Sequence, residues 1–185
     1  MADIPGYVAG KWQIDQVHSE VAFTVRHMMV SKVRGRFDKF EGEIVTGENP
    51  TDSSVTATVE MASINTNNEQ RDGHIRSADF FEVEKHPTMD FRSTGIRNFG
   101  GEGFLLDGEL SLKGVTKPVT FEVEINGIGP DAYGGTRIGF SALAEINRGD
   151  FGISFNGPIP GAPGGVIVSD KVTLSLEIEA VLQQG

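Results

Sequence analysis

Apolar and polar residues alternate over long stretches of this chain. From Val172 to Leu182 every second residue is apolar, and polar residues such as Thr173 and Glu177 occupy most positions between them. The same alternation recurs at residues 21–25, 55–61, 104–112, 119–125 and 138–146. Since successive side chains on a strand point to opposite faces, each segment is predicted to be a strand with one apolar face. Many such strands need a shared interior, so the pattern predicts an all-β fold.

The lengths and spacing of these segments favour a closed barrel. Strands are predicted at residues 10–15, 19–27, 33–45, 54–62, 88–97, 102–113, 117–127, 135–147 and 170–182. Gly35 and Gly42 lie inside the third strand, where glycine usually marks a bulge or bend. Bends help a sheet close, and closure removes the exposed edges that such long strands would leave. We therefore predict one domain over residues 1–185, an antiparallel β-barrel of about eight strands.

One segment interrupts the β pattern. Thr66 and Glu69 have the spacing of a capping box, in which Thr66 would cap a helix and Glu69 would bond back to it. A helix is therefore predicted over residues 66–77, as the only substantial helix of the chain. Its body is too polar to stand alone, so it is expected to cap one barrel end, with Phe80 and Phe81 as anchors.

Composition excludes several classes of function. The net charge is −10, from 16 basic and 26 acidic residues, which disfavours nucleic acid and anionic membrane surfaces as partners. Cysteine is absent, so disulfides, thiolate nucleophiles and zinc–thiolate sites are excluded. No stretch approaches the ~20 apolar residues of a membrane span. The first residues show no basic region followed by an apolar run, so a cytoplasmic location is expected.

The sequence contains no motif typical of catalysis or of metal binding. The four histidines His18, His27, His74 and His86 lack the spacing of a local metal clamp, so no metal site is predicted. His18 and Ser19 are neighbours on a strand and point to opposite faces, so they cannot form a Ser–His pair. No catalytic residue and no cofactor other than a bound lipid is predicted.

Blocks of residues along the whole chain resemble the YceI family. One block runs from Trp12 to Met28 and contains Asp15-Gln-Val-His18-Ser19. The others lie at residues 31–37, 40–42, 71–74, 79–81, 86–93, 108–116, 147–152 and 170–172. The resemblance implies an extended, lipocalin-like barrel that binds long amphiphiles such as polyisoprenoids, isoprenoid quinones or fatty amides. It implies no catalytic residues. Family precedent and apolar residues within 156–169 make a homodimer plausible.

The leading functional hypothesis is a non-catalytic carrier that transports an isoprenoid or similar lipid in its interior. One alternative is an enzyme that acts on such a lipid at the barrel mouth, through His27 or through Arg148 and Asp150. The other is a ligand-free structural or stress-response protein, whose barrel would be filled by its own phenylalanines. The chain contains 12 of them, against 2 tyrosines and 1 tryptophan.

The predicted ligand contacts are the inward-facing residues of the strands, together with two polar residues expected near the mouth. They are Phe23, Val25, Phe37, Phe91, Phe121, Phe140, Ala142, Ala144, His27 and Arg148. Phe140, Ala142 and Ala144 share one strand face, and the two alanines leave space beside them. That space is either a ligand tunnel or is occupied by phenylalanines from opposite strands, and we favour the tunnel.

Overall fold

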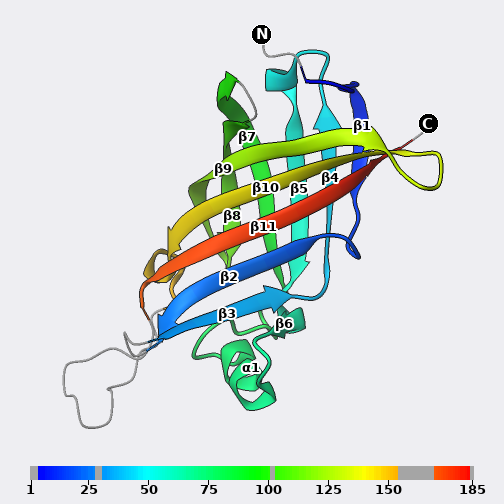
Figure 1. Ribbon diagram of the computed structural model, residues 1–185. Coiled ribbons are helices and arrows are strands. Elements are labelled where there is room, and N and C mark those ends of the chain that lie inside the picture. The colour runs from blue at the N-terminus through cyan, green and yellow to red at the C-terminus, as the bar shows by residue number, and fades with distance from the viewer. Residues whose placement is uncertain (1–3, 28–30, 101–102, 154–168, 184–185) are drawn as a thin grey trace.

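Strands make up most of the protein in the computed structural model, which describes residues 4–27, 31–100, 103–153 and 169–183 (Figure 1). The strands are β1 (Gly10–Ile14), β2 (Glu20–His27), β3 (Ser31–Phe37), β4 (Phe40–Thr46), β5 (Ser54–Glu60), β6 (Ile64–Asn65), β7 (Thr88–Gly100), β8 (Gly103–Leu112), β9 (Val115–Pro130), β10 (Thr136–Asn147) and β11 (Lys171–Leu182). Short 3-10 turns lie at Pro50–Asp52, Met61–Ser63 and Arg148–Phe151.

The sheet closes on itself. Neighbouring strands follow the order β1-β4-β5-β7-β8-β9-β10-β11, all antiparallel, and β11 pairs back to β1 through Trp12 with Leu182 and Ile14 with Ala180. This ring confirms the predicted barrel of about eight strands. Strands β2, β3 and β6 extend the wall from β11, since β2 pairs with residues 173–177 of β11 below the part that β1 occupies (Figure 1).

Two details of the predicted strands are wrong. The predicted strand 33–45 is two strands, β3 and β4, separated at residues 38–39. Gly35 and Gly42 cause no bulge, because their strands pair with β2 and β5 in continuous register. Gly35 instead leaves room for an aromatic ring, since a Cβ at this position would overlap the ring of Phe23. The register shifts lie elsewhere, at Gly139/Phe140 in β10 and within β7.

The predicted helix exists but begins later than expected. Helix α1 (Glu69–Arg76) is the only α-helix among the described residues, and it lies at one end of the barrel (Figure 1). The capping-box prediction is wrong. Asn68 is the N-cap, and its side chain accepts a hydrogen bond from the backbone N–H of Arg71. Thr66 is bonded instead to Asp72, whose carboxylate accepts from the Thr66 backbone N–H at 2.9 Å.

The half of the barrel nearest α1 is filled by its own side chains. Phe23, Phe37, Met61 and Phe151 are all buried there. The ring of Phe37 lies 5.7 Å from that of Phe23 and 6.3 Å from that of Phe81, measured between centroids. Phe80 and Phe81 pack against this core, as predicted.

The other half is organised around Trp12. Its side chain is fully buried among Ile44, Ile138 and Ala180. The indole Nε1 donates a hydrogen bond to Thr46 Oγ1 at 2.9 Å, and that hydroxyl donates to the carbonyl of Val8 at 2.8 Å. The single tryptophan therefore joins β1 to β4 inside the barrel. Of the helices in the described part of the chain, none is long and apolar enough to cross a membrane.

Candidate functional site

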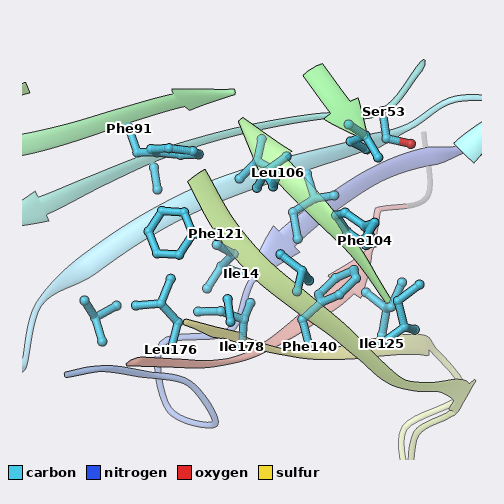
Figure 2. Close-up of a pocket in the computed structure, with 18 of the residues that line it drawn as sticks. Ile14, Ser53, Phe91, Phe104, Leu106, Phe121, Ile125, Phe140, Leu176 and Ile178 are labelled. Carbon is cyan, nitrogen blue, oxygen red and sulfur yellow. The ribbon is translucent and has the colours of Figure 1, made fainter. Parts of the chain in front are cut away.

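An apolar cavity lies inside the barrel, in the half away from α1. Its volume is about 170 Å³. All of its lining residues are apolar except Tyr7, Glu41, Thr46 and Ser53. Figure 2 shows side chains that converge on it from several strands, among them Ile14, Phe91, Phe104, Leu106, Phe121, Ile125, Phe140, Leu176 and Ile178. The alternation seen in the sequence therefore builds an interior with almost no polar surface.

The end of the cavity near the N-terminus carries its hydroxyl groups. The Tyr7 hydroxyl donates to the carbonyl of Gly47 at 2.5 Å, and Ser53 Oγ accepts from the Gly47 N–H at 3.1 Å. Tyr7, Ser53, Phe99 and Ile4 are only half-buried here. We call these four residues the rim, because they lie together at the end of the cavity near the N-terminus.

The opposite end of the cavity is closed at one level across the barrel. On several strands the cavity ends at one residue, and the next inward-facing residue toward α1, two positions along the strand, belongs to the packed core instead of the lining. These pairs are Val21 and Phe23, Val59 and Met61, Leu110 and Leu112, Phe121 and Val119, Ala142 and Ala144, and Leu174 and Val172. Phe37 lies at this boundary, in contact with Phe23 and Phe81. We call these three rings the aromatic floor.

Half of the predicted ligand contacts line the cavity. Those that do are Phe37, Phe91, Phe121, Phe140 and Ala142. Phe23 belongs to the floor itself, and Val25 and Ala144 belong to the packed core on its α1 side. Space is thus present beside Ala142 but not beside Ala144. Whether any of these residues contacts a ligand stays a prediction.

Arg148 and His27 were expected at the mouth of the barrel. Arg148 lies elsewhere, and the side chain of His27 cannot be placed. Arg148 is buried, with Nε donating to the Ser169 carbonyl and Nη1 to the Ile153 carbonyl, both at 2.9 Å. It joins the end of β10 to the chain that precedes β11, far from the rim. The side chain of His27 lies outside the described residues. Asp150, the partner of Arg148 in the catalytic alternative, is exposed.

Comparison with known proteins places this architecture in a family. The YceI-like domain matches residues 12–180. The chain belongs to the YceI family. It is 38% identical over 181 residues to the protein YceI of Escherichia coli O157:H7. The alignment covers 96% of this chain and 90% of that protein. The resemblance identified from the sequence blocks is thereby confirmed.

Solved structures of other proteins share the fold of this YceI domain. The crystal structure of Burkholderia cenocepacia BcnA matches with a TM-score of 0.78 at 22% identity, over 90% of this chain and 98% of that one. A polyisoprenoid binding domain from Saccharophagus degradans, implicated in plant cell wall breakdown, matches with a TM-score of 0.71 at 15% identity. This match covers 95% of this chain and all of the other. These likenesses confirm the lipocalin-like barrel.

A charged cluster on the outer face of the YceI domain joins three strands. Asp15 Oδ2 lies 2.7 Å from His18 Nδ1 and 2.7 Å from Arg137 Nη1, and Arg137 also contacts Asp131 and Glu179. The donor atoms of Asp15, His18 and Glu179 are close enough to share a metal ion. Arg137 already supplies the positive charge that a metal would bring, so the cluster fits an ion-pair network that fastens the end of β1 to β10 and β11.

The ion pairs around Arg137 should make the free energy of unfolding depend on pH in the acid range. A hydrogen bond from Arg137, and to a smaller extent one from His18, holds the pKa of Asp15 well below its usual range. A carboxyl with a lowered folded pKa stabilises the fold above its unfolded pKa of about 3.9, and this contribution is lost as pH falls toward the folded pKa. We expect Arg137→Gln to weaken the decline in unfolding free energy between pH 5 and pH 2, measured by urea denaturation.

A second arginine provides the control for this experiment. Arg92 pairs with Glu109 at 2.9 Å on the exposed outer face, where ion pairs contribute little. The unfolding free energy of Arg92→Gln should therefore fall between pH 5 and pH 2 as steeply as that of the unmodified protein. Equal declines in Arg137→Gln and the unmodified protein would show that Asp15 is not stabilised by Arg137.

Proposed function

We propose that this YceI protein is a non-catalytic carrier of a long-chain lipid, an isoprenoid or similar amphiphile, held in the barrel cavity. The observation that carries the proposal is the apolar lining of a cavity enclosed by the barrel. Only an apolar ligand fills such a space without losing hydrogen bonds to water. The fold shared with a polyisoprenoid binding domain supports the same ligand class.

The lining favours storage and transport of a ligand over its chemical conversion. Of the lining residues, only Tyr7 and Glu41 carry titratable side chains. The Tyr7 hydroxyl donates to a backbone carbonyl, and Glu41 is exposed between the buried residues Phe40 and Gly42, so it lies on the outer face. General acid–base catalysis needs a titratable group beside the reacting atoms, and the described lining offers none below the rim.

The energy available to such a complex comes from hydrocarbon burial. A chain that buries roughly 500 Å² at about 25 cal/mol per Å² gains on the order of 12 kcal/mol before association costs. An apolar cavity of about 150 Å³ accepts a benzene ring. The present volume, about 170 Å³, therefore admits a long chain only if lining rings move apart. Phe104 and Phe140 are only half-buried, so they can move at a lower cost than the fully buried lining residues.

Other parts of the functional hypothesis remain proposals. A polyisoprenoid, an isoprenoid quinone and a fatty amide all suit an apolar interior. The cytoplasmic location and the homodimer rest on the sequence alone. Most of segment 156–169, which motivated the dimer, lies outside the described residues.

Trp12 provides the experiment that tests the proposal. It is the only tryptophan in the chain, and it shares a packed cluster with Ile44 and Ile138, which line the cavity. Titration with geranylgeraniol should give a saturable change in its fluorescence with about one ligand per chain. Prenol, which has the same headgroup and almost no chain, should give none. Absence of a saturable change with geranylgeraniol would contradict lipid binding in this cavity.

A further inference from the structure

We propose that the outer face of strands β2 and β3 docks on an anionic membrane surface through a cluster of four cationic side chains. They are Arg26, Lys32, Arg34 and Arg36, and we call them the basic patch. The inference goes beyond lipid binding in the cavity, since it concerns the outside of the barrel and the way in which the protein meets a membrane.

The charge of the chain is unevenly distributed. Residues 20–37 contain four basic side chains and one acidic side chain, so this segment has a net charge of +3. The other residues contain 12 basic and 25 acidic side chains. The total of −10 predicts that anionic surfaces are repelled, but at physiological ionic strength charges farther away than about 8 Å are largely screened. The nearest charges therefore decide whether a surface is attracted, and on this face they are mostly positive.

The strand geometry places the four cations on one side of the barrel wall. Lys32, Arg34 and Arg36 occupy every second position of β3, and Arg26 lies directly across from Lys32 on β2. All four residues are exposed. At about 3.3 Å per residue and about 4.8 Å between strands, the patch spans about 13 Å by 5 Å. Such an array can meet several lipid phosphates at once and needs no pocket.

The arrangement of the cations indicates a partner outside the protein. Arg26 and Lys32 are directly opposite each other, and like charges in this position destabilise a sheet. Neither side chain forms an ion pair with a residue that the structure describes. The other two members of the patch each have one carboxylate partner, at N–O distances of 3.0 and 2.9 Å. Exposed pairs of this kind contribute little, so these arginines can also turn to a phosphate.

Protection of a sheet edge accounts for only part of this charge. Strand β3 pairs with β2 on one side and on the other side only through Arg36 and Phe37, which pair with β6. Cationic side chains on such an edge hinder pairing with other chains, which accounts for Lys32 and Arg34. Arg26 lies on β2, between β3 and β11, where it protects no edge (Figure 1).

A membrane suits the patch better than a soluble polyanion. Single-stranded nucleic acid needs aromatic side chains on which its bases stack, and the other outward residues beside the patch on β2 include Ala22 and Thr24. Each lysine or arginine close to an anionic membrane increases the affinity about fivefold. A carrier of a lipid that is insoluble in water also has to meet the membrane that holds the lipid. The choice of a membrane over other anionic partners rests on the proposed function, whereas the positive charge of this face does not.

Sedimentation with lipid vesicles tests the docking. The protein should bind phosphatidylcholine vesicles that contain about 30% phosphatidylglycerol at least tenfold more tightly than vesicles of phosphatidylcholine alone. Salt at about 1 M should abolish this difference. Equal binding to both kinds of vesicle, or binding to neither, would overturn the proposal. Binding of soluble polyglutamate but not of the anionic vesicles would identify an acidic protein segment as the partner and would also overturn it.

Two double variants separate the basic patch from the net charge. Arg26→Gln with Lys32→Gln should weaken binding to the anionic vesicles at least tenfold. Arg92→Gln with Lys117→Gln removes the same charge from exposed residues of β7 and β9 and should bind like the unmodified protein. Unchanged binding in the first variant, or equal losses in both, would show that the patch does not dock the protein. Both variants should keep the Trp12 response to geranylgeraniol, so failure of docking is distinguishable from failure of the proposed function.

Discussion

Replacing Ala142 with phenylalanine should weaken geranylgeraniol binding at least tenfold, whereas Leu143→Phe should leave it unchanged. Ala142 lies between Val123 of β9 and Leu176 of β11, and all three residues line the cavity. A ring at this position would fill the space above the floor. Leu143 is the next residue on the same strand but is 51% exposed, opposite Glu122 and Ser175 on the outer face. The two variants therefore place the same phenylalanine side chain on opposite sides of one wall.

The expected size of this effect follows from the area that the ligand loses. A tenfold change in affinity corresponds to about 1.4 kcal/mol. At about 25 cal/mol per Å² this equals about 55 Å² of lost apolar contact. A phenylalanine side chain occupies more area than that. Both variants keep Trp12 as the only tryptophan, so the same fluorescence titration measures them. Equal affinities in folded Ala142→Phe and Leu143→Phe would show that the chain does not pass Ala142.

Trp12→Ala should lower the free energy of unfolding by about 3–5 kcal/mol, the range for removing a large aromatic side chain from a core. The indole is fully buried and fills the space between β1 and β4, next to the cavity. Its loss would also remove the hydrogen bond to Thr46. Urea denaturation followed by far-ultraviolet circular dichroism measures the change without the tryptophan signal.

Two further variants separate the contributions of Trp12. Trp12→Phe keeps much of the apolar volume and removes the hydrogen bond, so its cost should be smaller than that of the alanine variant. Tyr133→Ala, at a residue that is 91% exposed, should change stability by less than about 0.5 kcal/mol. A cost below about 1 kcal/mol for Trp12→Ala would contradict the packing described for this half of the barrel.

The barrel and the inward faces of its strands could be predicted because they follow from a local signal. Alternation with a period of two assigns each side chain to a face, and it did so correctly for Phe91, Phe121 and Phe140, which line the cavity. Closure could be inferred from the lengths of the strands. Gly35 was misinterpreted because a glycine that makes room for a ring across the strand looks, in sequence, like one that makes a bulge.

The depth of the cavity could not be predicted, because it depends on contacts between distant segments. Ala142 and Ala144 carry the same sequence signal and lie on the same face. Only Ala142 lines the cavity, since the floor is made by rings from β2, from β3 and from the segment after α1. The hydroxyls of Tyr7 and Ser53 were missed because both residues lie outside the strands, where no periodicity reveals their direction.

The helix cap shows a competition between two local interactions. Thr66 and Glu69 have capping-box spacing, but Thr66 is bonded to Asp72 and Asn68 caps the helix instead. Asn67, between them, has a φ of +63°, so the chain turns before the helix begins. Several polar residues in this segment can cap, and the sequence alone does not rank them.

The central claim is that the cavity holds a lipid chain, and organic extraction of freshly purified protein followed by mass spectrometry tests it most directly. The account predicts about one equivalent of a long-chain lipid, such as an isoprenoid, per protein chain. The same extraction of Ala142→Phe, purified in parallel, should yield much less of this lipid. Equal amounts from both proteins, or none from either, would contradict the claim.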